Sequence, residues 1–228
     1  MKQISYMPDL SKLSLDEYKQ ELKTGRLLPS RKPLLEDIDL RFNILKNEGF
    51  TNIYDLKSCL ESNTKFKLLI TRTKLPDKYL KLLKREIGSI LPTPIIFSDV
   101  PNISKTILKK LKELNISDTE MLFPYVINPK LRKNFEEKSK LTQDETLWLT
   151  KLVDVSRIKW VGPKLARLIV DTKFDTVKKL ATANPSDALD SFNEVKKNYK
   201  YYKGSLGIND INSWIKQVVS KTPLVIKY

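Results

Sequence analysis

The sequence reads Val155-Ser-Arg-Ile-Lys-Trp-Val-Gly-Pro-Lys-Leu-Ala-Arg-Leu-Ile169 at the stretch that best defines the fold. Apolar residues recur at helical spacing on both sides of Gly162, which predicts one helix ending, a tight turn and a second helix beginning. Pro163 suits the first turn of the second helix, because an amide at that position would have no intrahelical acceptor. Ala166 is small enough for two short helices to pack closely. We therefore predict two short helices joined by a hairpin turn.

The same pattern recurs three times along the chain. Each copy has a helix end, an apolar anchor, a Ser, Thr or Asp capping position, and a leucine six residues after the anchor. The anchors are Phe50, Ile116 and Phe174, which are separated by similar lengths of chain. Gly49 and Asn115 precede the first two anchors, and both residue types suit a left-handed helix end. One unit would therefore hold about 60 residues in four or five short helices.

This repeat defines the predicted domain organisation. An N-terminal arm over residues 1–32 contains one helix, which we expect to begin with a capping box at Ser14 to Glu17. The predicted fold class is all-α, with three tandem units of short helices and little or no sheet. The second and third units are expected to share a continuous helix around residues 148–155. The three helical repeats cover residues 33–91, 92–153 and 154–228.

The turn of the third repeat resembles the helix-hairpin-helix motif, whose pattern is hydrophobic-x-x-hydrophobic-x-Gly-hydrophobic-Gly-x-x-x-Ala. The stretch 155–166 matches this pattern at every position except one, where Trp160 replaces the first glycine. The aligned turn has Asn102 and Ser104 in the second repeat, whereas the first repeat has lost the pattern. In this superfamily the hairpin amides bind a nucleic-acid phosphate, so the resemblance implies the same contact here.

More widely, the chain from about Leu15 onward resembles an uncharacterised bacterial family built from tandem degenerate helix-hairpin-helix, or SAM-like, units. The resemblance rests on residues 27–31, 157–166 and 174–181. It implies the all-helical fold. It leaves the activity open, because that family has no established activity.

The net charge favours an anionic partner. The 228 residues carry a formal charge of +15, and residues 151–228 hold 15 Lys and Arg against 7 Asp and Glu. This most basic part contains the best-preserved turn, which favours nucleic acid as the partner. The alternative is that every exposed helix face is rich in lysine, with no bearing on function.

The chain has no histidine and one cysteine, Cys59. Histidine is the commonest general base and zinc ligand, and a Cys-rich metal site needs several thiolates. We therefore expect no enzyme activity, no metal and no cofactor. Cys59 has no partner for an internal disulfide, and the sequence shows neither a signal peptide nor an apolar run of about 20 residues. We therefore expect a cytoplasmic protein that does not enter a membrane.

The third repeat supplies the main candidate site. The backbone N–H groups of Trp160, Gly162 and Lys164 would bind a phosphate at the start of a helix. The side chains of Lys159, Lys164 and Arg167 would add positive charge. The alternative is structural, with Gly162 making only a tight turn and Trp160 either filling the core or shielding the amides.

Two further sets of lysines extend the candidate site. Lys105 and Lys109 follow the turn of the second repeat. Lys196, Lys197 and Lys200 alternate with tyrosines, an arrangement that is able to stack bases and hold phosphates. The alternatives are a solvated helix face for the first set and, for the second, a loop whose tyrosines cover the edge of the third repeat.

These patterns predict a non-catalytic protein that binds nucleic acid without sequence preference. Contacts to phosphate position a protein on the backbone and carry no sequence information. DNA is favoured over RNA by fold analogy alone. The alternative function is a scaffold for protein–protein interaction, with another protein or a second copy of the chain as the partner.

Overall fold

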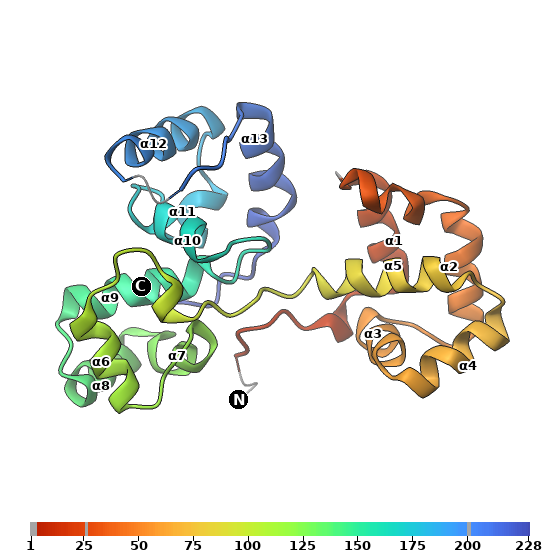
Figure 1. Ribbon diagram of the computed structural model, residues 1–228, viewed down its shortest axis with the longest axis horizontal. Helices are drawn as coiled ribbons and strands as arrows, with labels where there is room; N and C mark the ends of the chain where they lie inside the picture. Colours follow the sequence, from red (N-terminus) through yellow and green to blue (C-terminus); the bar gives the residue numbers. More distant parts are fainter. Residues whose placement is uncertain (1–3, 26, 200–201) are drawn as a thin grey trace. The chain divides into compact units, whose positions relative to one another are not determined.

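The computed structural model describes residues 4–25, 27–199 and 202–228 (Figure 1). Over these residues the regular structure consists of α-helices and 3-10 helices, apart from two isolated β-bridges. The predicted all-α class is therefore confirmed. Contacts divide the chain into two compact units. The N-terminal unit is residues 8–91, and the C-terminal unit is residues 92–228 with the segment that ends at Met7.

The N-terminal unit begins with the 3-10 helix η1 (Leu10–Lys12) and the helix α1 (Leu15–Thr24). The capping box predicted for α1 is present, because the Ser14 hydroxyl accepts from the Glu17 amide at 3.2 Å and the Glu17 carboxylate accepts from the Ser14 amide at 2.9 Å. The core includes Phe42, Leu56 and Leu83, which are fully buried. The unit continues with η2 (Pro29–Leu35), α2 (Ile38–Asn47), α3 (Ile53–Glu61), α4 (Asn63–Thr73) and α5 (Asp77–Gly88).

The C-terminal unit has a separate core, which includes the buried side chains of Phe135, Leu152 and Phe192. The continuous helix expected around residues 148–155 forms the end of α9, so α9 leads directly into the turn of interest. The elements of this unit are η3 (Phe97–Asp99), α6 (Lys105–Glu113), α7 (Thr119–Val126), α8 (Pro129–Ser139), α9 (Gln143–Val155), α10 (Pro163–Val170), α11 (Val177–Ala181), α12 (Pro185–Asn198), α13 (Ile208–Gln217) and η4 (Val219–Lys221).

Helix starts recur at matching distances from the three anchors. The helices α3, α7 and α11 each begin three residues after their anchor. In each of them the N-cap side chain accepts a hydrogen bond from the amide of the third helical residue, and these caps are Asn52, Asp118 and Thr176. Left-handed backbone also recurs, at Gly49 and Asn115 before the first two anchors and at Lys74 and Lys140, which follow those anchors at equal distances. The division into three repeats stays a prediction, which this spacing supports.

A buried ion pair fastens the tail of the chain to the C-terminal unit. Arg157 Nη1 lies 3.4 Å from Asp154 Oδ1, and Arg157 Nη2 donates to the carbonyl of Pro223 at 2.8 Å. Asp154 Oδ2 accepts from the amide of Val177 and from the hydroxyl of Tyr228, each at 3.0 Å. Burial raises the pKa of the Asp154 carboxyl in spite of the neighbouring guanidinium. The network therefore holds α9, the start of α11 and the tail together around the turn that follows α9.

Candidate nucleic-acid interface

The turn before α10 has left-handed backbone at Trp160, the position where the resembled pattern has its first glycine. Trp160 has a φ angle of 70°, which lies in the left-handed region that favours glycine. A side chain with a Cβ costs about 1–2 kcal/mol in this conformation. The Val161 amide donates to the carbonyl of Ile158 at 3.1 Å and closes the turn. Gly162 follows at the surface as the N-cap of α10.

The side chain of Trp160 is 57% exposed, so the alternative in which it fills the core is wrong. The core side of the turn is already occupied by the buried side chains of Ile158 and Val161. The Lys159 Nζ lies 4.5 Å from the centroid of the Trp160 ring, which is a cation–π contact. The turn therefore presents an exposed aromatic ring beside a half-buried lysine.

The amides at the start of α10 are open. No side chain caps the helix, and none of the described residues accepts a hydrogen bond from the amides of Trp160, Gly162 or Lys164. The first helical bond to Gly162 comes from Ala166, whose amide donates to the Gly162 carbonyl at 2.9 Å. A Cβ built on Gly162 meets no atom within 4 Å, so the surface beside this residue is uncrowded. Such a helix start is suited to an anion.

The lysines of the turn and Arg167 have different surroundings. Lys164 is exposed and forms no ion pair with any described residue. Arg167, in contrast, lies 2.7 Å from Asp171 and donates to the carbonyl of Pro101 at 3.2 Å, with its guanidinium 5.1 Å from the Trp148 ring. These contacts engage Arg167 in the packing of α10, whereas the exposed Lys164 lies at the helix start itself.

The turn before α6 has the same backbone feature but a closed helix start. Asn102 is left-handed with a φ of 56°, and it precedes its anchor by the same distance as Trp160 does. The Ser104 hydroxyl accepts a hydrogen bond from the amide of Thr106 at 3.2 Å. Lys105 and Lys109 are exposed on α6, as a solvated helix face requires. Because Ser104 already accepts from one amide, the start of α6 has a side-chain cap that the start of α10 lacks.

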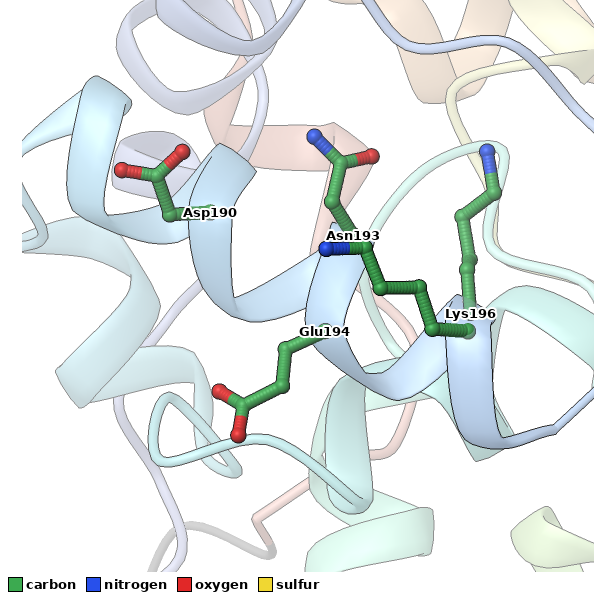
Figure 2. A pocket seen from close by; sticks show the side chains of 5 residues that line it. Asp190, Asn193, Glu194 and Lys196 are labelled. Atoms are coloured by element: carbon green, nitrogen blue, oxygen red, sulfur yellow. The ribbon is translucent and has the colours of Figure 1, made fainter.

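The lysines near the end of α12 line a shallow pocket with mixed charge (Figure 2). Figure 2 shows the labelled side chains of Asp190, Asn193, Glu194 and Lys196 projecting from one helix, α12, with the two carboxylates pointing in different directions. Lys196 Nζ donates to the Gly204 carbonyl at 2.6 Å, and Lys200 lies outside the described residues. Two carboxylates offset two ammonium groups, so the pocket has no charge excess for a polyanion. Its lining is Asp190, Asn193, Glu194, Lys196 and Lys197.

Sequence reasoning missed a second cationic surface. It is a groove between α8, α9 and α11, whose lysines and arginine belong to separate segments of the sequence and form no local motif. Among the described residues there is no group of three His, Cys, Asp or Glu side chains with the geometry of a metal site. None of the helices within the described ranges combines the length and the apolar character needed to span a membrane.

The geometry defines an all-helical protein with an exposed, cationic turn at an uncapped helix start. A family model, described as a domain of unknown function (DUF4332), matches residues 101–220, and the chain belongs to this family. The matched region runs from the turn before α6 to η4 and includes the turn before α10. Comparison with curated proteins and with solved structures gave no match.

Proposed function

We propose that this protein binds nucleic acid without sequence preference and without catalysis, through the turn before α10. The observation that carries the proposal is the uncapped helix start, where none of the described residues accepts a hydrogen bond from the amides of Trp160, Gly162 or Lys164. A helix N-terminus with free N–H groups attracts a phosphate through both hydrogen bonds and the helix dipole. Lys159 and Lys164 add cationic side chains beside it.

The charge distribution supports a polyanionic partner. Residues 151–228 carry 15 Lys and Arg against 7 Asp and Glu, and they contain the turn. Contacts through backbone amides and lysines read the phosphate backbone and not the bases, so binding is sequence-independent. DNA is the preferred partner by analogy with the helix-hairpin-helix superfamily.

We also infer that the chain contains degenerate copies of one helix-hairpin-helix unit. Each copy consists of four successive helices. The matching helix starts of α3, α7 and α11 support this inference. The left-handed residues Asn102 and Trp160 support it as well, because each precedes its anchor by the same distance. In this scheme the third copy keeps the open helix start, and the second copy closes it with Ser104.

Fluorescence anisotropy with labelled duplex DNA, single-stranded DNA and RNA of about 20 nucleotides tests the proposed function. The Lys164→Glu variant should lose most of the affinity, because it places a negative charge at the open amides. Wild-type affinity should fall steeply as salt rises, since binding releases counterions from the phosphates. Arg167 is left unchanged in this test because its contacts are structural.

Lys78→Glu is the matched control. Lys78 is exposed on α5 of the N-terminal unit, forms no ion pair with a described residue, and changes the net charge by the same amount. The control should bind as the wild type does. Absence of binding to all three nucleic acids at low salt would refute the proposal, and a stable oligomer by light scattering would then favour the scaffold function.

A further inference from the structure

The C-terminal unit contains a groove of about 980 Å³ between α8, α9 and the start of α11. This volume falls within the range of small-molecule sites, which are clefts or cavities of about 300–1,000 Å³. Its apolar lining includes Leu147 from α9 and Tyr228 from the tail. None of the residues of the turn before α10 lines the groove, so it is a separate surface.

Positive charge is in excess in this groove. Asp175 contacts two of the cations, with its carboxylate 2.7 Å from Lys151 Nζ and 2.8 Å from Lys179 Nζ. Glu136 is the carboxylate in the lining itself. Five cations therefore face two carboxylates, which leaves three positive charges, and a concave surface concentrates their field. The five cations are Arg132, Lys133, Lys151, Lys178 and Lys179.

Three of these cations have no carboxylate partner among the described residues. Lys133 on α8 and Lys178 on α11 are exposed and unpaired. The Arg132 guanidinium is buried, and it donates to two neutral carbonyls, those of Val126 at 3.0 Å and of Lys227 at 2.7 Å. Both bonds come from Nη1, and Glu136 acts on the guanidinium only through its charge, without an ion pair among the described residues. A buried guanidinium with no carboxylate bonded to it favours an anionic ligand nearby.

The aromatic wall of the groove is held in place. The hydroxyl of Tyr228 donates to Asp154 Oδ2 at 3.0 Å, and the Arg132 guanidinium lies 5.8 Å from the centroid of the Tyr228 ring. Both contacts tie the ring to helices of the C-terminal unit. A ring fixed in this way loses little freedom on binding, which favours affinity for a flat partner such as a base.

We propose that this groove binds a phosphate ester of the nucleotide type, carried either by a free nucleotide or by a nucleic-acid strand. The phosphates would contact Lys133 and Lys178, which approach from α8 and α11, and the base would lie near Tyr228. A nucleoside diphosphate carries about three negative charges at neutral pH, which matches the charge excess of the groove. This proposal holds whether or not the turn before α10 binds nucleic acid, because the two surfaces share no residue.

Isothermal titration calorimetry of the full chain with ADP, and separately with an oligothymidylate of about 12 nucleotides, tests the proposal. The Lys133→Ala/Lys178→Ala variant removes two charges without breaking an ion pair of the described residues. We expect its Kd for the ligand of the groove to rise at least about tenfold. The matched control is Lys67→Ala/Lys78→Ala, which removes two exposed lysines from the N-terminal unit.

The outcomes separate the two sources of the phosphate. Weaker ADP binding in the groove variant, with Lys164→Glu unaffected, supports a free nucleotide as the ligand. Weaker binding of the oligothymidylate alone supports a strand. Equal loss in the groove variant and in its control overturns the proposal, because the effect is then one of net charge. Absence of binding by both ligands to the wild type also overturns it.

Discussion

Trp160 shows at the scale of one residue what the turn before α10 requires. Its left-handed backbone is unfavourable for any side chain with a Cβ. We therefore expect the Trp160→Gly variant to be more stable than the Trp160→Ala variant by about 1 kcal/mol. Alanine is ordinarily the more stabilising of the two residues, so this order is reversed. Both variants lack the indole, and their difference therefore reports the backbone conformation alone. Urea denaturation measures it, and an alanine variant of equal or greater stability would contradict the left-handed turn.

Tyr79 on α5 supplies a second prediction at this scale. Its hydroxyl is buried with no hydrogen-bond partner among the described residues, and burial raises its pKa to about 12. We expect Tyr79→Phe to stabilise the N-terminal unit by about 1 kcal/mol, because an unsatisfied polar group is removed. The stacking of Arg41 on the ring, at 4.4 Å, is kept.

The raised pKa of Tyr79 also sets a pH dependence. Since its folded pKa exceeds the unfolded value of about 10, its contribution to stability is complete below pH 10. The contribution is lost as the pH rises through about 12. Chemical denaturation between about pH 10 and about pH 12 should show a loss of stability in the wild type that the Tyr79→Phe variant lacks. A phenylalanine variant that is less stable at neutral pH would show that the hydroxyl has a partner.

Single residues also show which features the sequence reveals. Left-handed backbone at Gly49 and Asn115 follows from residue type, because glycine and asparagine tolerate it. The same conformation at Lys74, Lys140 and Trp160 carries no such signal, since those residue types avoid it. The exposure of Trp160 escaped sequence reasoning for a related reason, because burial depends on what already fills the core.

At the scale of the element, α10 differs from α6 by one capping residue. Gly162 has a φ of −93° and open space at its Cβ, so serine fits there without strain. We expect Gly162→Ser to stabilise the helix by a few tenths of a kcal/mol, because its hydroxyl accepts from a free amide. Nucleic-acid affinity should fall in the same variant, because the hydroxyl competes with phosphate for that amide. Thermal unfolding and fluorescence anisotropy measure the two effects.

Ser104→Gly on α6 is the reverse of that change and serves as its control. It removes the hydroxyl that accepts from the Thr106 amide, so it should destabilise slightly and leave binding at α10 unchanged. If Gly162→Ser instead keeps full affinity, the amides at the start of α10 are not the phosphate contact.

Elements were easier to predict from the sequence than the surfaces between them. The capping box at Ser14 and the all-helical class follow from local pattern and spacing. The groove between α8, α9 and α11 does not, because its cations come from distant parts of the chain, from Arg132 to Lys179, and Tyr228 joins them from the tail. The contact of Arg167 with the Pro101 carbonyl escaped sequence reasoning for the same reason, since no local pattern connects the two residues.

At the scale of the whole molecule, the two units have separate hydrophobic cores. Denaturation of the full chain is therefore not expected to be two-state, and each free energy of unfolding is assigned to the unit whose transition changes. Amide hydrogen exchange reports the stability of each unit by itself. It is suited to a change that affects one of the cores only.

Arg157→Ala is such a change, because it leaves Asp154 buried without its cationic partner in the C-terminal unit. We expect this unit to lose about 3–5 kcal/mol, with faster exchange in α9 and α11. Exchange in α3 and α5 of the N-terminal unit should stay the same.

Burial already raises the pKa of Asp154 in the folded protein, and the variant raises it further, so protonation favours the folded state. The stabilisation of the folded state by protonation of Asp154 is therefore complete below the unfolded pKa of about 3.9. It is lost as the pH rises through the folded pKa. The defect of the variant should grow with pH, and Asp154→Asn/Arg157→Met, which removes both charges, should show little of that pH dependence. A defect that is equal at all pH values, or that spreads to α3 and α5, would contradict this account of the ion pair.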